Sequence, residues 1–133
     1  MTKQTCIFSR VLALVMSVVV VGLSGCSPAS GGSFQIIRGG INTTPNSIEG
    51  AYDYYTGYYF KEAILEAGDV LLFELDVTTL DGQFSVRVEN SSGEKISAIG
   101  KESELVIESP GVYRVVTEAK GHQGAFSLTW EVK

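Results

Sequence analysis

Two hydrophobic patterns divide this chain. Near the amino terminus, the residues from Val11 to Leu23 form one nearly continuous apolar run, whereas apolar and polar residues alternate in short segments from Tyr54 onward. The alternation is clearest between residues 71 and 77, where every second residue is apolar. A period of two is typical of strands with one buried face, and no later segment shows a helical period of useful length. The pattern therefore predicts an all-β domain.

Turn residues separate the predicted strands. Asp81-Gly82 is a hairpin signal, and both Asn90 to Gly93 and Pro110-Gly111 end alternating segments. Counting the segments between these turns gives about eight strands, which we expect to pair as a single antiparallel β-sandwich over residues 51–133. A domain of roughly 100 residues is long enough to enclose one hydrophobic core.

The segment between the apolar run and this domain has a different composition. Residues 26–33 are mostly small and without apolar periodicity, as expected of a flexible tether. Residues 34–50 are predicted to be a weakly ordered lead-in. Within them, Phe34 to Ile37 is compatible with an edge strand, while Gly39 to Asn46 is rich in glycine, threonine and asparagine and predicts a loop.

The apolar run ends in the residues Leu23-Ser24-Gly25-Cys26, after a start made cationic by Lys3 and Arg10. This order resembles the signal helix and lipobox of bacterial lipoprotein precursors. The resemblance implies that residues 1–25 are a signal peptide, cut between Gly25 and Cys26, and that Cys26 carries lipid. An uncleaved transmembrane helix is disfavoured, because 13 apolar residues fall short of the roughly 20 that a bilayer requires. The remaining alternative is an ordinary secretory signal followed by a chance cysteine.

Processing of this kind would change both cysteine content and charge. Cys6 would be removed and Cys26 would be lipidated, so the mature domain would contain no disulfide. All 15 acidic residues follow Cys26 while two of the 10 basic ones precede it, which takes the net charge from −5 to −7. The remaining basic residues are scattered among carboxylates, which argues against nucleic acid as a partner.

The predicted location follows from the same lipid anchor. The membrane is the expected partner, through the lipid on Cys26. Ser27 follows the cysteine, and by resemblance to lipoproteins of two-membrane bacteria this favours the outer membrane. In a cell with one membrane, the protein would lie on the outer face of the plasma membrane.

The order of turns and aromatic residues resembles bacterial pre-peptidase C-terminal domains. The landmarks are Tyr59-Phe60, Ala67-Gly68-Asp69, Asp81-Gly82-Gln83-Phe84-Ser85-Val86, Ser92-Gly93, Pro110-Gly111-Val112-Tyr113 and Gly124-Ala125-Phe126-Ser127-Leu128. The likeness covers roughly residues 57–132 and implies a jelly-roll-like sandwich. Members of that family accompany secreted enzymes as accessory or binding modules, and some bind calcium through clustered acids. In this chain Asp81 lacks the second aspartate of such a site, so no metal site is predicted.

The sequence offers no set of catalytic residues. His122 is the only histidine and lies in Gly121-His122-Gln123-Gly124, which predicts an exposed residue in a hairpin turn. A catalytic base also needs a nucleophile and an orienting partner, and the sequence contains no Gly-x-Ser-x-Gly motif, phosphate loop or paired metal-binding histidines. We therefore expect neither an enzyme nor a cofactor.

One cluster remains as a candidate contact surface. Five of the six tyrosines fall within eight positions, at Tyr52, Tyr54, Tyr55, Tyr58 and Tyr59. Alternation along a strand would place them on both faces, so some rings would either be exposed or fill the end of the sandwich. The sequence thus predicts a small membrane-anchored binding or interaction module for an envelope glycan or a protein partner. The alternative is a structural envelope lipoprotein with no defined ligand.

Overall fold

The computed structural model of the chain describes residues 29–133. Their regular structure consists of seven strands: β1 (Ser30–Ile37), β2 (Gly40–Thr44), β3 (Ser47–Leu65), β4 (Val70–Glu89), β5 (Lys95–Ile99), β6 (Glu102–Val106) and β7 (Gly111–Val132). Every strand pair is antiparallel. The described residues include no helix long and apolar enough to cross a membrane. The lipobox, with Cys26 and its cleavage site, lies outside the described residues.

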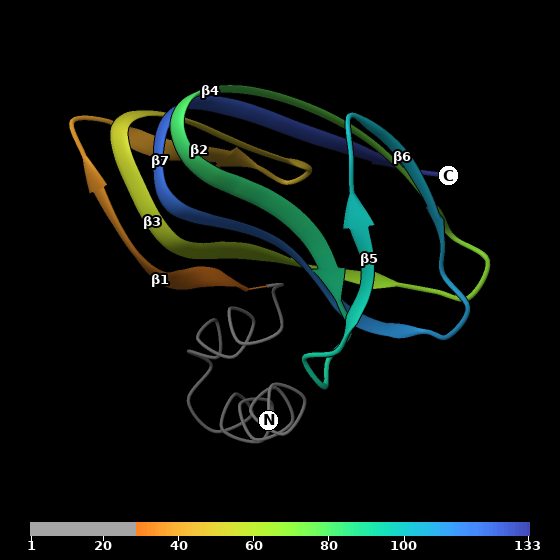
Figure 1. The fold of residues 1–133 in the computed structure, drawn as a ribbon. Coiled ribbons are helices and arrows are strands. Elements are labelled where there is room, and N and C mark those ends of the chain that lie inside the picture. Colours follow the sequence, from red (N-terminus) through yellow and green to blue (C-terminus); the bar gives the residue numbers. More distant parts are fainter. Residues whose placement is uncertain (1–28) are drawn as a thin grey trace, which may run out of the picture.

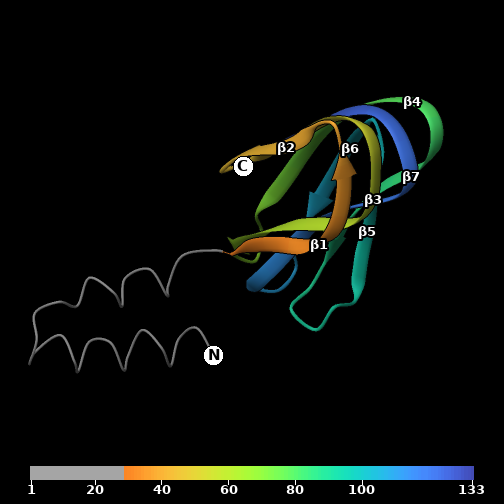
Figure 2. The same cartoon turned by 90° about the vertical axis from the view of Figure 1, so that its left-hand side faces the viewer.

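Three long strands build both layers of the sandwich. β3, β7 and β4 are adjacent, and each bends near its middle so that its two halves lie in different layers (Figures 1 and 2). In the first layer, β2 pairs with the first half of β3 and β6 with the first half of β4. In the second layer, β1 pairs with the second half of β3 and β5 with the second half of β4. The all-β sandwich predicted from the alternation is therefore confirmed.

The bend is built from irregularities in the strand ladders. The β3–β7 register shifts twice between Tyr52 and Gly57, and the β4–β7 register shifts twice between Thr79 and Gln83. Bulges of this kind bend a strand and increase its twist without ending the pairing. Gly124 lies at this bend on β7 with a φ of 144°, and a Cβ atom there would overlap the carbonyl oxygen of Thr78. The bent strands pack so closely that only glycine fits.

The bend joins two pairs of predicted strands into β4 and β7, and β2 adds one strand that the sequence did not predict, which gives seven strands where about eight are predicted. Residues 71–77 and 84–88, which read as separate strands, are the two halves of β4. Residues 112–117 and 125–132 are likewise the two halves of β7. The hairpin predicted at Asp81-Gly82 is instead part of the bulge, because β7 continues to pair with β4 on both sides of it. Asp81-Gly82 thus changes the direction of the chain, but as a bend within β4 and not as a hairpin between two strands.

The lead-in segment contributes strands at the edges of both layers. β1 begins at Ser30 and is longer than the edge strand predicted at residues 34–37. β2 occupies Gly40–Thr44, where the sequence predicts a loop, and β3 already begins at Ser47. Pairing with β3 supplies the backbone hydrogen bonds of these residues, although few of their side chains are buried. Without a buried face, β2 shows no alternation that sequence reading could detect.

The core lies between the two layers. Its fully buried members include Ile48 and Leu128 from the first layer and Val88 from the second. Phe73 and Trp130 pack against each other there, with ring centroids 6.1 Å apart. Burial of each large apolar side chain contributes about 1.5–3 kcal/mol, and this packing leaves the outer faces of the two layers free to carry other groups.

Candidate functional site

The structure divides the five clustered tyrosines between the core and the surface. Tyr52 and Tyr55 belong to the core, with 7% and 0% of their surface exposed, so the prediction that they form part of a contact surface is wrong. The bulge between them removes one step of the alternation, which turns both rings inward. Tyr59 is half-buried and packs against the core, and Tyr54 is half-buried beside Gly121 at the bend. Of the five tyrosines only Tyr58 is exposed, with 41% of its surface accessible to solvent.

Tyr58 is the outer member of a stack on the second layer. Its ring lies 6.5 Å from that of Phe60, with only 15° between the two planes. The guanidinium carbon of Arg114 lies 4.4 Å from the centre of the Phe60 ring. Tyr58 pairs with Glu118 on β7, whereas Arg114 is four residues earlier on that strand and pairs with Glu62. Arg114 and Tyr58 therefore approach Phe60 from opposite ends, as expected for a cation–π contact followed by an aromatic stack.

Arg87 is held beside this stack by two carboxylates. Its Nε donates to Glu89 and its Nη1 to Glu118, both at 2.6 Å. Partial burial disfavours the charged guanidinium, yet the hydrogen bonds and charges of Glu89 and Glu118 outweigh it and raise the pKa of Arg87. Cross-strand register places Phe60, Val116 and Arg87 in one row. The planar cation is thus fixed in position before any ligand arrives.

These groups surround a small hollow of about 170 Å³, lined by Tyr58, Phe60, Arg87, Glu89, Arg114 and Val116. We call these residues, together with Glu118, the aromatic face. Although Val116 points outward from the sheet, only 2% of its surface is exposed, because the surrounding side chains cover it. An ordered set of rings and ion pairs over an apolar floor can bind a flat ligand that carries polar groups at its edges.

A second hollow adjoins the aromatic face towards the bend. It measures about 530 Å³ and is lined by Thr79, Gly82, Gln83, Phe84, Ser85, Glu118 and Lys120. Glu118 lines this hollow and also accepts the hydrogen bond from Arg87. Ser85 is in register with Glu118, and Gln83 with Lys120, so two rows of polar side chains continue the surface beyond Tyr58. The two hollows therefore form one continuous strip along β7.

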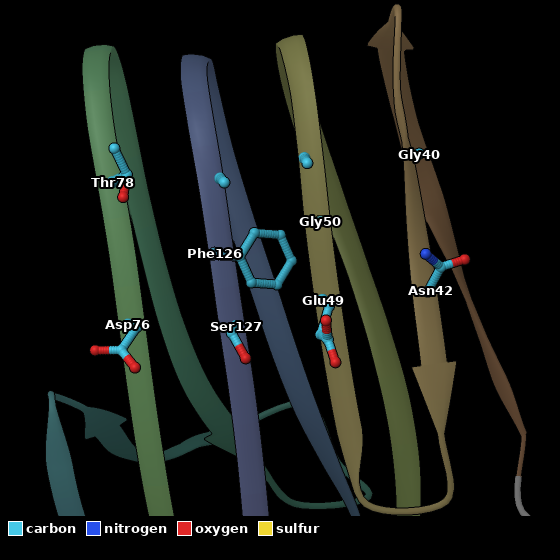
Figure 3. A pocket seen from close by; sticks show the side chains of 10 residues that line it. Gly40, Asn42, Glu49, Gly50, Asp76, Thr78, Phe126 and Ser127 are labelled. Carbon is cyan, nitrogen blue, oxygen red and sulfur yellow. The ribbon is translucent and has the colours of Figure 1, made fainter.

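A third hollow lies on the outer face of the first layer (Figure 3). It measures about 420 Å³, and its polar row runs across four strands through Asn42, Glu49, Ser127 and Asp76. The neighbouring row consists of the small or short side chains of Gly40, Ala51, Ala125 and Thr78. The hollow exists because this second row has almost no side-chain volume.

The outer side of the first layer is strongly acidic. Six exposed carboxylates, which we call the acidic face, belong to Glu49, Glu74, Asp76, Glu102, Glu104 and Glu131. None of them forms an ion pair with another residue in the range 29–133. Within the same range no group of three acidic, histidine or cysteine residues is placed to hold a metal ion. The carboxylates are spread over the sheet and do not converge on one point.

His122 is not an exposed turn residue, contrary to the sequence prediction. It is fully buried at the bend, where its Nδ1 lies 2.7 Å from the Tyr52 hydroxyl and its Nε2 lies 2.8 Å from the Thr79 hydroxyl. Burial lowers the pKa of its imidazole, so the ring is neutral in the folded protein at pH 7. The glycines around it, which suggested a turn, lie in the bent part of β7. Its partners and burial assign His122 to the structure of the bend.

Comparison with known proteins adds a likeness in fold. No family model and no curated protein sequence matches this chain. Among solved structures it is similar to Aeromonas hydrophila PliG, a periplasmic inhibitor of g-type lysozyme, at 12% identity and a TM-score of 0.50. The match covers 79% of this chain and 89% of PliG. At such low identity the likeness shows a shared β-sandwich fold and assigns no ligand.

Two sugar complexes show weaker similarity. TmCBM61 in complex with beta-1,4-galactotriose matches at 13% identity and a TM-score of 0.43, over 80% of this chain and 88% of that one. The carbohydrate-binding module CBM6cm-2 from Cellvibrio mixtus lichenase 5A, in complex with cellotriose, matches at 15% identity and a TM-score of 0.39. That match covers 77% of this chain and 92% of the module. The candidate site of this chain therefore has to be judged on its own side chains.

Proposed function

We propose that this chain is a lipid-anchored protein of the bacterial envelope whose β-sandwich binds glycan through the aromatic face. The observation that carries the proposal is the exposed ring of Tyr58, which ends a stack of planar groups beside an arginine fixed by two carboxylates. In this proposal the other outer face and the buried bend are structural. The sandwich has no catalytic role.

The chemistry of the aromatic face suits a sugar. A pyranose ring has apolar C–H faces that pack on an aromatic ring, while its hydroxyl groups point outward in the plane and need hydrogen-bond partners. Tyr58 supplies the ring, and Arg87 with Glu118 supplies a donor and an acceptor beside it. Because the ion pairs already hold these side chains in place, little conformational entropy is lost when the ligand binds.

Replacing Tyr58 with alanine tests the site. The variant should bind glycan at least about fivefold more weakly, because stacking of a ring on an aromatic side chain contributes on the order of 1–3 kcal/mol. Its stability should change by less than about 1 kcal/mol, since much of the ring is exposed. A glycan array followed by isothermal titration calorimetry of the best ligand measures both affinities.

The matched control for this experiment is Val106→Ala. Val106 is an exposed apolar residue on β6, in the other layer, and 56% of its surface is exposed. The control should bind like the wild type. If Tyr58→Ala binds glycan as tightly as the wild type does, the aromatic face is not the binding site. If no glycan binds the wild type, the glycan function is wrong and the structural alternative is favoured. A variant that also removes Tyr55 would not be informative, because Tyr55 belongs to the core.

The anchor is tested separately. Cys26→Ala should leave the protein unprocessed and without acyl chains, because only the thiol of Cys26 can accept the diacylglyceryl group expected from the lipobox. Metabolic labelling with an alkyne fatty acid should mark the wild type and not this variant, and globomycin should cause the wild-type precursor to accumulate. Cys6→Ala is the control and should be labelled normally. Mature protein in the presence of globomycin would contradict lipoprotein processing.

A further inference from the structure

We propose that the glycan is acidic: one sugar ring stacks on the free side of Tyr58, and its carboxylate reaches Lys120 in the adjoining hollow. This inference rests on the glycan function proposed above and specifies the class of ligand. It arises from the order of groups along the strip that joins the two hollows.

The stack on the second layer is open at one end only. Phe60 is covered by Arg114 on one side and by Tyr58 on the other. Tyr58 has a ring neighbour in Phe60 alone among the described aromatic pairs of the outer face, and 41% of its surface is exposed. A further planar group can therefore extend the stack only beyond Tyr58. That direction leads away from Phe60 and towards the bend.

The larger of the two hollows lies next to Tyr58 across Glu118, which lines that hollow and is in register with Tyr58. Along β7, Glu118 is level with Tyr58, and Lys120 follows two residues later on the same face of the strand. Gln83 and Ser85 of β4 are in register with Lys120 and Glu118, respectively. A ring that stacks on Tyr58 therefore meets hydroxyl and amide groups on one edge and an ammonium group just past it.

Lys120 differs from the two arginines of the aromatic face, because both arginines are paired with carboxylates. Arg87 is paired with Glu89 and Glu118, and Arg114 lies 3.6 Å from the carboxylate of Glu62. Lys120 is exposed and forms no ion pair with any residue in the range 29–133. Arg87 is thus shared by two carboxylates and Arg114 is paired with a third, whereas Lys120 is the one lysine that lines either hollow, and it lies where the ligand's substituents would lie.

The rest of the molecule strengthens this distinction. The acidic face lies on the other layer, and the folded domain is negative overall, so an anionic glycan is repelled elsewhere on the surface. Because repulsion between exposed charges decays within about 8–10 Å at physiological salt, a distant acidic face does not cancel the local attraction of Lys120. Recognition of a carboxylate would therefore be confined to this one strip.

The test compares each acidic sugar with its neutral counterpart. The probes are tetrasaccharides of galacturonate, glucuronate and mannuronate, and the same tetrasaccharides after reduction of each carboxylate to a primary alcohol. Titration calorimetry of the wild type should show that at least one acidic form binds about fivefold tighter than its reduced form. This preference should shrink when the salt concentration is raised from 50 mM to about 500 mM, because the charge pair is exposed.

Lys120→Gln should remove the preference, so that this variant binds the acidic sugar and its reduced form with equal affinity. Lys101→Gln removes an equal charge from the loop between β5 and β6 and should keep the preference. If the wild type binds both forms equally, or if Lys120→Gln retains the preference, the acidic-glycan inference is wrong while the glycan function survives. If no tetrasaccharide of either form binds and a neutral glycan does bind through Tyr58, the inference again fails alone. If no glycan binds at all, both proposals fail.

Discussion

Replacing Gly124 with alanine is expected to destabilise the sandwich by about 3–4 kcal/mol, a large part of the stability of a domain of this size. Gly124 has a φ of 144°, which residues other than glycine rarely adopt. In addition, the Cβ atom of an alanine would overlap the backbone carbonyl of Thr78. Backbone atoms cannot move aside as a flexible side chain can. Urea unfolding followed by tryptophan fluorescence of Trp130 measures the loss.

Gly93→Ala is the control that separates dihedral strain from close packing. Gly93 also has a positive φ, of 85°, but no atom lies within 4 Å of the position that a Cβ would occupy. This variant should lose only about 1 kcal/mol. Equal losses in the two variants would show that the close approach of β7 to β4 at the bend is unimportant for stability.

The second large effect is expected at His122. Substitution by leucine removes the hydrogen-bond partner of the Tyr52 hydroxyl, which lies 2.7 Å from the Nδ1 atom of the ring. A buried hydroxyl without a partner costs about 1–3 kcal/mol, so His122→Leu should lower the free energy of unfolding by about 2 kcal/mol. The double variant Tyr52→Phe/His122→Leu should recover about half of this loss, because it no longer buries the hydroxyl. No recovery in the double variant would contradict this explanation.

His122 also predicts a pH dependence. Burial lowers the pKa of the His122 imidazole in the folded state, whereas in the unfolded chain this imidazole has a pKa near 6.5. Below about pH 6.5 the unfolded chain therefore binds a proton at His122 more readily than the folded protein does. The free energy of unfolding should therefore fall as the pH drops below about 6.5, and titration of His122 should not change it above that value. In His122→Leu the decline between pH 6.5 and 5 should be absent. Unfolding titrations at both pH values distinguish the two proteins.

Much of the fold could be predicted from the sequence because the core strands alternate. The halves of β4 and β7 each carry apolar residues at every second position, so the class of fold and the register of the inward faces follow from the pattern. The joining of these halves could not be predicted, because Asp81-Gly82 looks the same in a hairpin and in a bulge. β2 was missed for another reason: as an edge strand with exposed side chains, it has no buried face to mark it.

The candidate site was only partly visible in the sequence. The cluster of tyrosines correctly indicates β3 as part of the candidate site. The bulges turn Tyr52 and Tyr55 inward, however, so that Tyr58 is the exposed member of the cluster. The position of Phe60 beside Tyr58 could be predicted from the sequence, since residues two apart on a strand lie on the same face. The positions of Arg87 and Arg114 could not be predicted in this way. They belong to β4 and β7, and only the register of these strands with β3 brings them close to Phe60.

The bent strands tie the two outer faces into one thermodynamic unit. One half of each of β3, β4 and β7 lies in the first layer and the other half in the second. Neither layer can therefore open without disrupting strands that also form the other layer. Backbone amides in both halves should therefore exchange with solvent only through a shared global opening, while those of β2, β5 and β6 exchange through local fraying. A ligand bound at the aromatic face would consequently slow amide exchange beneath the acidic face as well, without touching it.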